Sequence, residues 1–195
     1  MSILPRFTSA DLDLLPEDDK RYELIEGDLL VTHQPHWNHQ FVCNRLGRYL
    51  DIWSEGSGLG EVNAAPGIIL AEDEDVAPDL VWISNERLQT ALQGDGKLHQ
   101  VPELVVEVLS PGSRNELRDR QLKRKLYARR GVYEYWIVDW EAQQIEVYRR
   151  QDATLELMAT LFSADTLASP LLPGFGIPVG ALWRKKRGTD ATTSP

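Results

Sequence analysis

Apolar residues recur along this chain with two periods, which predict an alternation of helices and strands. Apolar positions three and four residues apart predict a helix over residues 38–53, and alternating positions predict a β-hairpin over residues 22–32. A further short helix is predicted over residues 9–15, ended by Pro16. Apolar runs, some of them rich in β-branched residues, predict strands over the following segments: 61–70, 78–83, 102–109, 133–139, 143–149 and 155–161.

This order of elements predicts a single α/β domain over residues 1–183, with a mixed central β-sheet flanked by helices. Segment 102–109 has apolar residues at both odd-numbered and even-numbered positions, so both faces of a strand there would be apolar. We therefore expect it to be a central strand that is covered on both sides. The polar segment 184–195 is predicted to be a disordered tail. The acidic run 72–75 is predicted to be a loop.

A strongly basic helix is predicted after residue 113. Ser113 and Glu116 fit a capping box at its start, and Gly131 fits its end. Residues 114–130 hold eight lysines and arginines and only two acidic residues, a local charge of +6 in a chain whose net charge is −9. Two interpretations remain open: a helix that faces a nucleic-acid backbone, or an ordinary solvated helix face.

Composition excludes several classes of protein. Hydrophobic residues make up 42% and charged residues 26% of the 195 residues, as in soluble globular domains. No apolar run is long enough to cross a bilayer, and residues 1–6 lack the features of a secretory signal, so we expect a cytoplasmic protein with no membrane partner. Cys43 is the only cysteine, which excludes a Cys-rich zinc site and favours a small core residue.

Two carboxylates lie in or beside apolar strands. Asp79 begins the apolar run 80–83, where it either faces water or points into a cleft. Glu107 lies between Val106 and Val108 in the most apolar strand of the chain. Glutamate is rarely buried without a partner, so Glu107 requires a cation, either a basic side chain or a metal ion.

The basic helix offers a lysine to this pair. Asp119, Lys123 and Tyr127 are spaced by four residues, and the helix follows directly after the strand that carries Glu107. An ordinary surface pair between Asp119 and Lys123 is the alternative. Two carboxylates that converge with a lysine would bind Mg²⁺ or Mn²⁺ and stabilise charge on a phosphate.

The residues that carry this pattern resemble a known family. Pro78-Asp79 followed by Glu107 in PELVVEVLSP resembles the PD-(D/E)XK nuclease superfamily. The segments RYELIEGDL, HQ, APDLVWI, PELVVEVLSP and GVYEYWIVD, together with Asp119, Lys123 and Tyr127, resemble the bacterial Uma-type restriction endonuclease family, formerly a domain of unknown function. The matching segments run from about residue 22 to residue 149.

The resemblance implies roles for several residues. The superfamily's lysine stands two residues after the glutamate, where this chain has Leu109; Lys123 on the next helix is the matching position in this family, with Lys125 as its rival. The backbone carbonyl of Val108 is implied as a metal ligand, and Glu23 as a supporting carboxylate in preference to Glu26.

The histidines of this region do not by themselves predict a catalytic or metal site. His39 matches a family histidine and is either a satisfied core residue or a contact at the rim of the cleft. His33 and His36, with irregular spacing in a Pro-containing loop, do not predict a metal site.

We therefore predict a magnesium-dependent endonuclease that hydrolyses phosphodiester bonds, with DNA favoured as substrate. Its predicted site residues are Asp79, Glu107, Lys123 and Glu23, with His39, Asp119 and Tyr127 as accessory residues. A homodimer is expected from the superfamily. Two alternatives remain: a non-catalytic protein in which Glu107 pairs with Lys123, and a metallohydrolase of a small phosphorylated substrate.

Overall fold

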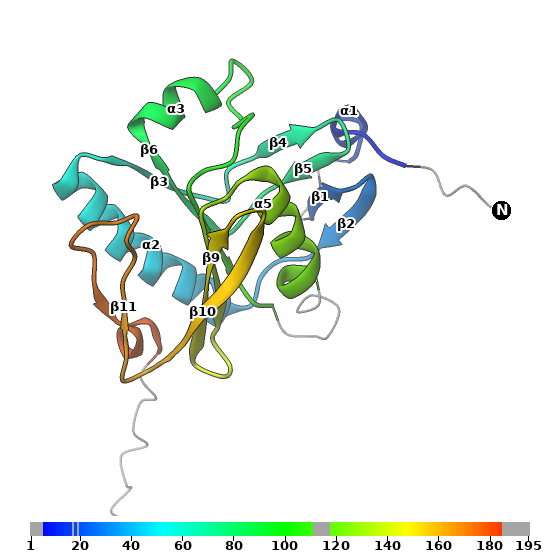
Figure 1. Ribbon diagram of the computed structural model, residues 1–195. Coiled ribbons are helices and arrows are strands. Elements are labelled where there is room, and N and C mark those ends of the chain that lie inside the picture. The colour runs from blue at the N-terminus through cyan, green and yellow to red at the C-terminus, as the bar shows by residue number, and fades with distance from the viewer. Residues whose placement is uncertain (1–5, 17, 19, 111–117, 185–195) are drawn as a thin grey trace, which may run out of the picture.

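A six-stranded sheet runs through the middle of the fold, and a four-stranded sheet lies beside it (Figure 1). The computed structural model describes residues 6–16, 18, 20–110 and 118–184, the last range without the side chains of residues 118 and 119. The large sheet has the strand order β10-β9-β8-β7-β6-β3, and the small sheet the order β2-β1-β5-β4. The helices are α1 (Ser9–Leu12), α2 (Trp37–Ser57), α3 (Asn85–Ala91), the π-helix η1 (Arg118–Lys123), α5 (Arg124–Arg130) and the 3₁₀-helix η2 (Val179–Leu182).

The large sheet is mixed, as predicted. Only β7 and β8 run parallel, joined by the segment that contains η1 and α5, while the other neighbours are antiparallel. Its strands are β3 (Gly60–Ala64), β6 (Leu80–Ser84), β7 (Leu104–Val108), β8 (Glu134–Asp139), β9 (Gln144–Gln151) and β10 (Thr154–Phe162). The small sheet comprises β1 (Arg21–Ile25), β2 (Asp28–Thr32), β4 (Ile68–Ala71) and β5 (Glu74–Val76), and a separate ribbon comprises β11 (Thr166–Leu167) and β12 (Ile177–Pro178).

Helices α2 and α5 cover opposite faces of the large sheet (Figure 1). Because side chains alternate along a strand, Leu104 and Val106 of β7 pack in the core layer that contains α2, and Val105 packs in the layer that contains α5. The predicted apolar face of α2 is confirmed: Leu46 and Leu50 are fully buried, each contributing about 1.5–3 kcal/mol. The predicted central strand is therefore covered on both sides.

Turn chemistry explains how the first hairpin forms. The two-residue turn Glu26-Gly27 has positive φ at both positions (55° and 76°), as a type I′ turn requires. The predicted hairpin over residues 22–32 is confirmed. Gly131, at φ 95°, ends α5 as predicted. The predicted capping box at Ser113 and Glu116 and the tail beyond residue 184 lie outside the described residues.

Two predicted elements were wrong. The predicted strand 61–70 is two strands, β3 and β4, which belong to different sheets. The extended chain is interrupted between them because Ala65 has φ 50° and Pro66 has no N–H to donate to a neighbouring strand. The first two residues of the acidic run form a turn, but Glu74 and Asp75, also predicted as a loop, begin β5 and are buried. Distant cations make this possible: Glu74 pairs with Arg129 and Arg130 of α5.

Helix α1 also ends earlier than the predicted residue 15, and Leu14 beyond it is exposed. None of the helices among the described residues has the length and apolar character needed to span a membrane.

Candidate active site

A cleft of about 380 Å³ opens where the small sheet meets the ends of β6 and β7. Four segments that are distant in sequence supply its charged lining: Arg21 and Glu23 of β1, Asp79 just before β6, Glu107 of β7, and Lys123 at the end of η1. The structure thus brings together the four residues that the sequence predicted as catalytic. With Asp18 and Lys20 at its exposed edge included, four carboxylates share this cleft with three basic side chains, and this net negative charge favours binding of a cation.

Lys123 lies between two buried carboxylates. Its Nζ is 2.8 Å from Oε1 of Glu107 and 2.9 Å from Oε1 of Glu23. All three side chains are at most 3% exposed. A buried ammonium costs several kcal/mol unless anions compensate it, so this arrangement depends on both glutamates. The backbone N–H of Ala77 also donates to Glu23, which fixes that carboxylate against the chain that leads into β6.

Tyr127 fixes the orientation of Glu107. Its hydroxyl donates to Oε1 of Glu107 at 3.0 Å, one helical turn after Lys123, so a single helix face supplies both donors. Burial, and then the negative charge of Glu107, raises the pKa of Tyr127 well above its usual value. The phenol therefore remains a hydrogen-bond donor at neutral pH.

Asp79 accepts a backbone hydrogen bond at the end of β7 that a neighbouring strand would otherwise accept. In the antiparallel pair, β6 begins at Leu80 opposite Val106, so the backbone of β7 beyond that point lacks a partner on this side. The N–H of Val108 instead donates to Oδ2 of Asp79 at 2.9 Å. Val108 also lines the cleft, as expected for the predicted carbonyl ligand.

Neighbouring donors keep Asp79 ionised. Burial opposes its ionisation, but the hydrogen bond from His39, the N–H of Val108 and the charge of Lys123 help to outweigh burial, and the pKa of Asp79 lies below its ordinary value. Arg21 adds a longer contact, 3.4 Å from its Nη1 to Oδ1 of Asp79. A carboxylate that is negative at neutral pH is ready to ligate a cation.

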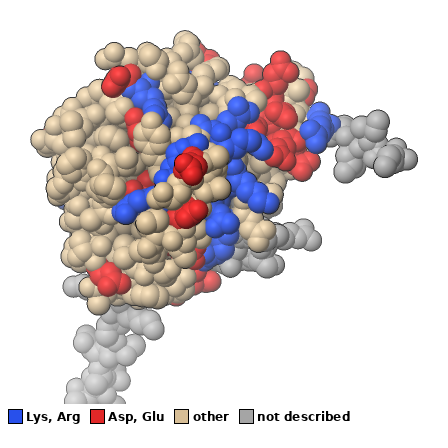
Figure 2. Space-filling view, in the orientation of Figure 1, with Lys and Arg blue, Asp and Glu red and all other residues tan. Residues whose placement is uncertain are grey.

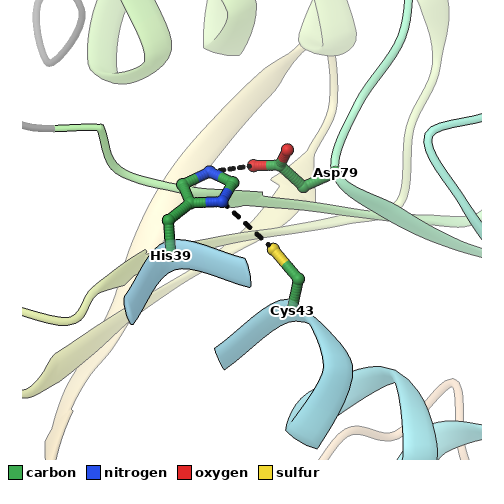
Figure 3. A group of neighbouring side chains, drawn as sticks. All are labelled: His39, Cys43 and Asp79. Carbon is green, nitrogen blue, oxygen red and sulfur yellow. Dashed lines mark hydrogen bonds and ion pairs between the residues drawn. The ribbon is translucent and has the colours of Figure 1, made fainter. Parts of the chain in front are cut away.

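His39 connects Asp79 to the only cysteine (Figure 3). Its Nε2 lies 3.1 Å from Oδ2 of Asp79, and its Nδ1 lies 3.6 Å from Sγ of Cys43, one turn further along α2. A carboxylate requires a donor, so we assign the proton to Nε2; Nδ1 then accepts the S–H of Cys43. Burial, and then the negative charge of Asp79, raises the pKa of the Cys43 thiol.

The remaining predicted residues lie in different surroundings. Lys125, the rival of Lys123, is exposed, and Glu26 is in the hairpin turn, paired with Arg129. His33 lines the cleft, but His36 stacks on a tryptophan, so the three histidines form no cluster. The side chain of Asp119 lies outside the described residues.

Sequence analysis missed Arg21 and Lys20, which also line the cleft. The signal for Arg21 was available: it stands two residues before Glu23 on the same strand, so the two side chains share a face. The spacing of four residues already places His39 and Cys43 on one face of α2, whereas the contact of His39 with Asp79 depends on where α2 packs.

The basic helix is largely paired with acidic side chains of the same chain. Figure 2 shows lysines and arginines gathered over the face that carries α5, β9 and β10, with acidic side chains among them. Arg120 pairs with Asp139 and Glu146, Arg129 with Glu26 and Glu74, and Arg130 with Glu74. Among the described side chains of this helix, these three arginines therefore have acidic partners within the chain, and both interpretations of the helix stay predictions.

Comparison with known families identifies the family of this chain. Residues 9–180 match the model of the Uma2 family, described as "Putative restriction endonuclease". The chain belongs to the Uma2 family. Membership supports a nuclease-type function for this α/β fold. No curated protein matches the chain.

Two solved structures are similar to this chain. One is described as a putative nuclease belonging to DUF820 from Anabaena variabilis ATCC 29413; it is 17% identical, covers 91% of this chain and 97% of its own, and superposes with a TM-score of 0.73. Another is the type IIG restriction endonuclease BpuSI, 14% identical over 62% of this chain and 13% of its own, with a TM-score of 0.39. The first of these similarities shows that the fold is shared.

Proposed function

We propose that this protein is a metal-dependent nuclease that hydrolyses phosphodiester bonds in nucleic acid, with DNA as the favoured substrate. One observation carries the proposal: three buried carboxylates, Glu23, Asp79 and Glu107, converge with Lys123 in a cleft of a chain that belongs to a restriction endonuclease family.

The donor atoms suit a hard divalent cation. Asp79 and Glu107 offer carboxylate oxygens and Val108 offers a backbone carbonyl, the ligand types that Mg²⁺ and Mn²⁺ prefer. When bound there, such an ion would polarise the phosphate and promote ionisation of a water molecule. The lowered pKa of Asp79 supports this role, because the ligand is ionised before the cation arrives.

The chain's own residues would position the reactants. Lys123, held by Glu23 and Glu107, would orient the attacking water and stabilise negative charge that develops on the phosphate. Glu23 would hold Lys123, and Tyr127 would hold Glu107. Arg21 at the mouth of the cleft would contact a phosphate of the substrate.

A non-catalytic protein on the same fold is the second candidate. The 2.8 Å contact between Lys123 and Glu107 favours it, since this ion pair satisfies both buried charges without a metal. The pairing of the basic helix with acidic residues also favours it. The two candidates differ in whether cations bind the folded state.

The test is a cleavage assay on single- and double-stranded DNA, RNA and nucleotides, with Mg²⁺ or Mn²⁺. Asp79→Asn removes a ligand charge while keeping the side chain's shape, and Asp18→Asn is the matched control at the exposed edge of the same cleft. We expect the native protein and the control to cleave a polynucleotide and Asp79→Asn to lose cleavage. Turnover of nucleotides alone would indicate a small-substrate metallohydrolase. Absence of all turnover, with no rise in Tm on adding metal, would indicate the non-catalytic protein.

A homodimer and a cytoplasmic location remain predictions. Strand β10 is an edge of the large sheet and exposes Leu157, Met158 and Phe162, which suits contact with a second copy. Light scattering of the eluting protein would give the mass in solution.

A further inference from the structure

Cys43 is a buried ligand-type side chain to which the proposed nuclease chemistry gives no role. Its sulfur, a nitrogen of His39 and an oxygen of Asp79 lie within 4.8 Å of one another. These residues are 6%, 4% and 8% exposed, so water competes little for their donor atoms. His39 and Asp79 line the cleft, which gives an ion a path to the group.

The spacing of the first two donors, which form a hydrogen bond in the absence of metal, is compatible with tetrahedral coordination of Zn²⁺. Around tetrahedral Zn²⁺, a sulfur about 2.3 Å away and a nitrogen about 2.0–2.1 Å away stand about 3.6 Å from each other. The distance from Sγ of Cys43 to Nδ1 of His39 is 3.6 Å. The two residues are one turn apart on α2, whose backbone is fixed by packing on the large sheet.

We propose that His39, Cys43 and Asp79 form a binding site for a thiophilic divalent cation such as Zn²⁺, distinct from the oxygen-lined Mg²⁺ site but sharing Asp79 with it. Sulfur and imidazole ligands select against Mg²⁺ and favour Zn²⁺. Three protein ligands leave a fourth position for a water molecule, as in open zinc sites.

Binding requires one deprotonation and a local rearrangement. The thiol of Cys43 releases its proton to solvent when the metal–sulfur bond forms, since a coordinating thiol is deprotonated by the metal. Nδ1 of His39 exchanges the S–H of Cys43 for the ion without any change of tautomer. Asp79 exchanges its contact with Nε2 of His39 for the ion.

Sharing Asp79 makes the two sites compete. A carboxylate drawn towards Zn²⁺ would be less available to Mg²⁺ in the cleft, so Zn²⁺ would inhibit the nuclease even in an excess of Mg²⁺. This consequence rests on the proposed function, whereas the zinc site itself does not.

The site is tested first without any activity measurement, on the metal-depleted full-length protein. We expect Co²⁺ to produce a thiolate-to-cobalt charge-transfer band in the near ultraviolet, which Cys43→Ala abolishes. Calorimetry should show Zn²⁺ affinity at least about tenfold weaker in Cys43→Ala. His33→Ala, in the same cleft, is the matched control and should bind as the native protein does. Absence of the band, or equal affinity in Cys43→Ala, would overturn the site and leave only a hydrogen-bonded group.

A measurement on the native protein alone covers the case in which Cys43→Ala does not fold. X-ray absorption at the zinc edge of the protein loaded with one equivalent of Zn²⁺ should show a sulfur neighbour at about 2.3 Å. A coordination shell of nitrogen and oxygen alone would overturn the site.

Inhibition is then measured with Mg²⁺ as the activating ion. Cys43→Ala should need at least about tenfold more Zn²⁺ than the native protein for the same inhibition. Equal inhibition of both would mean that Zn²⁺ acts at the oxygen ligands, and would overturn the competition. If the native protein cleaves nothing, the cobalt and zinc measurements still decide the site, so failure of the two proposals can be told apart.

Discussion

Replacement of Lys123 by methionine would remove the only fully buried lysine or arginine among the described residues. Methionine retains most of the volume, so the main effect is electrostatic: Glu23 and Glu107 lose the ammonium that lies 2.9 and 2.8 Å from them. Removal of one partner of a buried ion pair lowers the free energy of unfolding by about 3–5 kcal/mol. For a chain of 195 residues this corresponds to a fall in Tm of roughly 6–20 °C.

The assay is urea unfolding in the presence of a chelator, with Lys125→Met as the matched control. Lys125 is exposed on the same helix, so its replacement should change the free energy of unfolding by no more than about 0.5 kcal/mol. Lys123→Met combined with Glu107→Gln should be more stable than Lys123→Met alone, because one of the two uncompensated carboxylates is gone. A loss below about 1 kcal/mol in Lys123→Met would refute the reasoning that this ion pair neutralises the buried glutamates.

Addition of Mg²⁺ to the same variants separates a metal site from a purely structural ion pair. Without Lys123, the cleft is more negative, so a cation that binds there should stabilise Lys123→Met more than it stabilises the native protein. An equal response of both proteins to Mg²⁺ would count against the carboxylates as a metal site.

Three further predictions follow from local geometry. Gly60→Ala should lower the free energy of unfolding by at least about 2 kcal/mol, because the new Cβ would lie 2.2 Å from a backbone oxygen of β6. Gly56→Ala, in α2 with open space around it, should instead raise the free energy of unfolding by about 0.5–1 kcal/mol. Similar results for the two variants in urea unfolding would contradict this. Tyr127→Phe should cost about 1.5–3 kcal/mol, since the hydroxyl bonds the charged Glu107, and this cost should shrink when Glu107→Gln is also present; an unchanged cost in the double-mutant cycle would argue against the contact. Cys43, buried and with a raised thiol pKa, should resist iodoacetamide in the native protein and react in urea, as followed by mass spectrometry; rapid alkylation under native conditions would show that the thiol is accessible.

Local patterns in the sequence were sufficient for most of the secondary structure. The periodicity of α2 and the apolar density of β7 each report how one element meets the core, so both could be recognised without the fold. The acidic strand β5 could not, because burial of Glu74 depends on Arg129 and Arg130, more than fifty residues away. An isolated acidic run is typical of a loop, and only tertiary ion pairing reverses that preference.

Part of the candidate site could likewise be predicted from local sequence, and part required the fold. A glutamate in the middle of an apolar strand requires a cation, so Glu107 was recognisable from its neighbours alone, and helical spacing placed Lys123 and Tyr127 on a single face. The choice between Lys123 and Lys125 was open in the sequence, because both follow the same strand on the same helix. The structure distinguishes them by burial: the first reaches Glu107, and the second is exposed.

By itself, then, the sequence determined the α/β class, the central strand and the need of Glu107 for a partner, since all of these follow from the apolar pattern of single segments. Only the tertiary structure decided which groups meet. Packing of α2 against the large sheet brings His39 and Cys43 to Asp79, and packing of the small sheet beside β6 brings Glu23 to Lys123. These contacts join segments 40 to 100 residues apart, and no spacing along the chain encodes a distance in space across such separations.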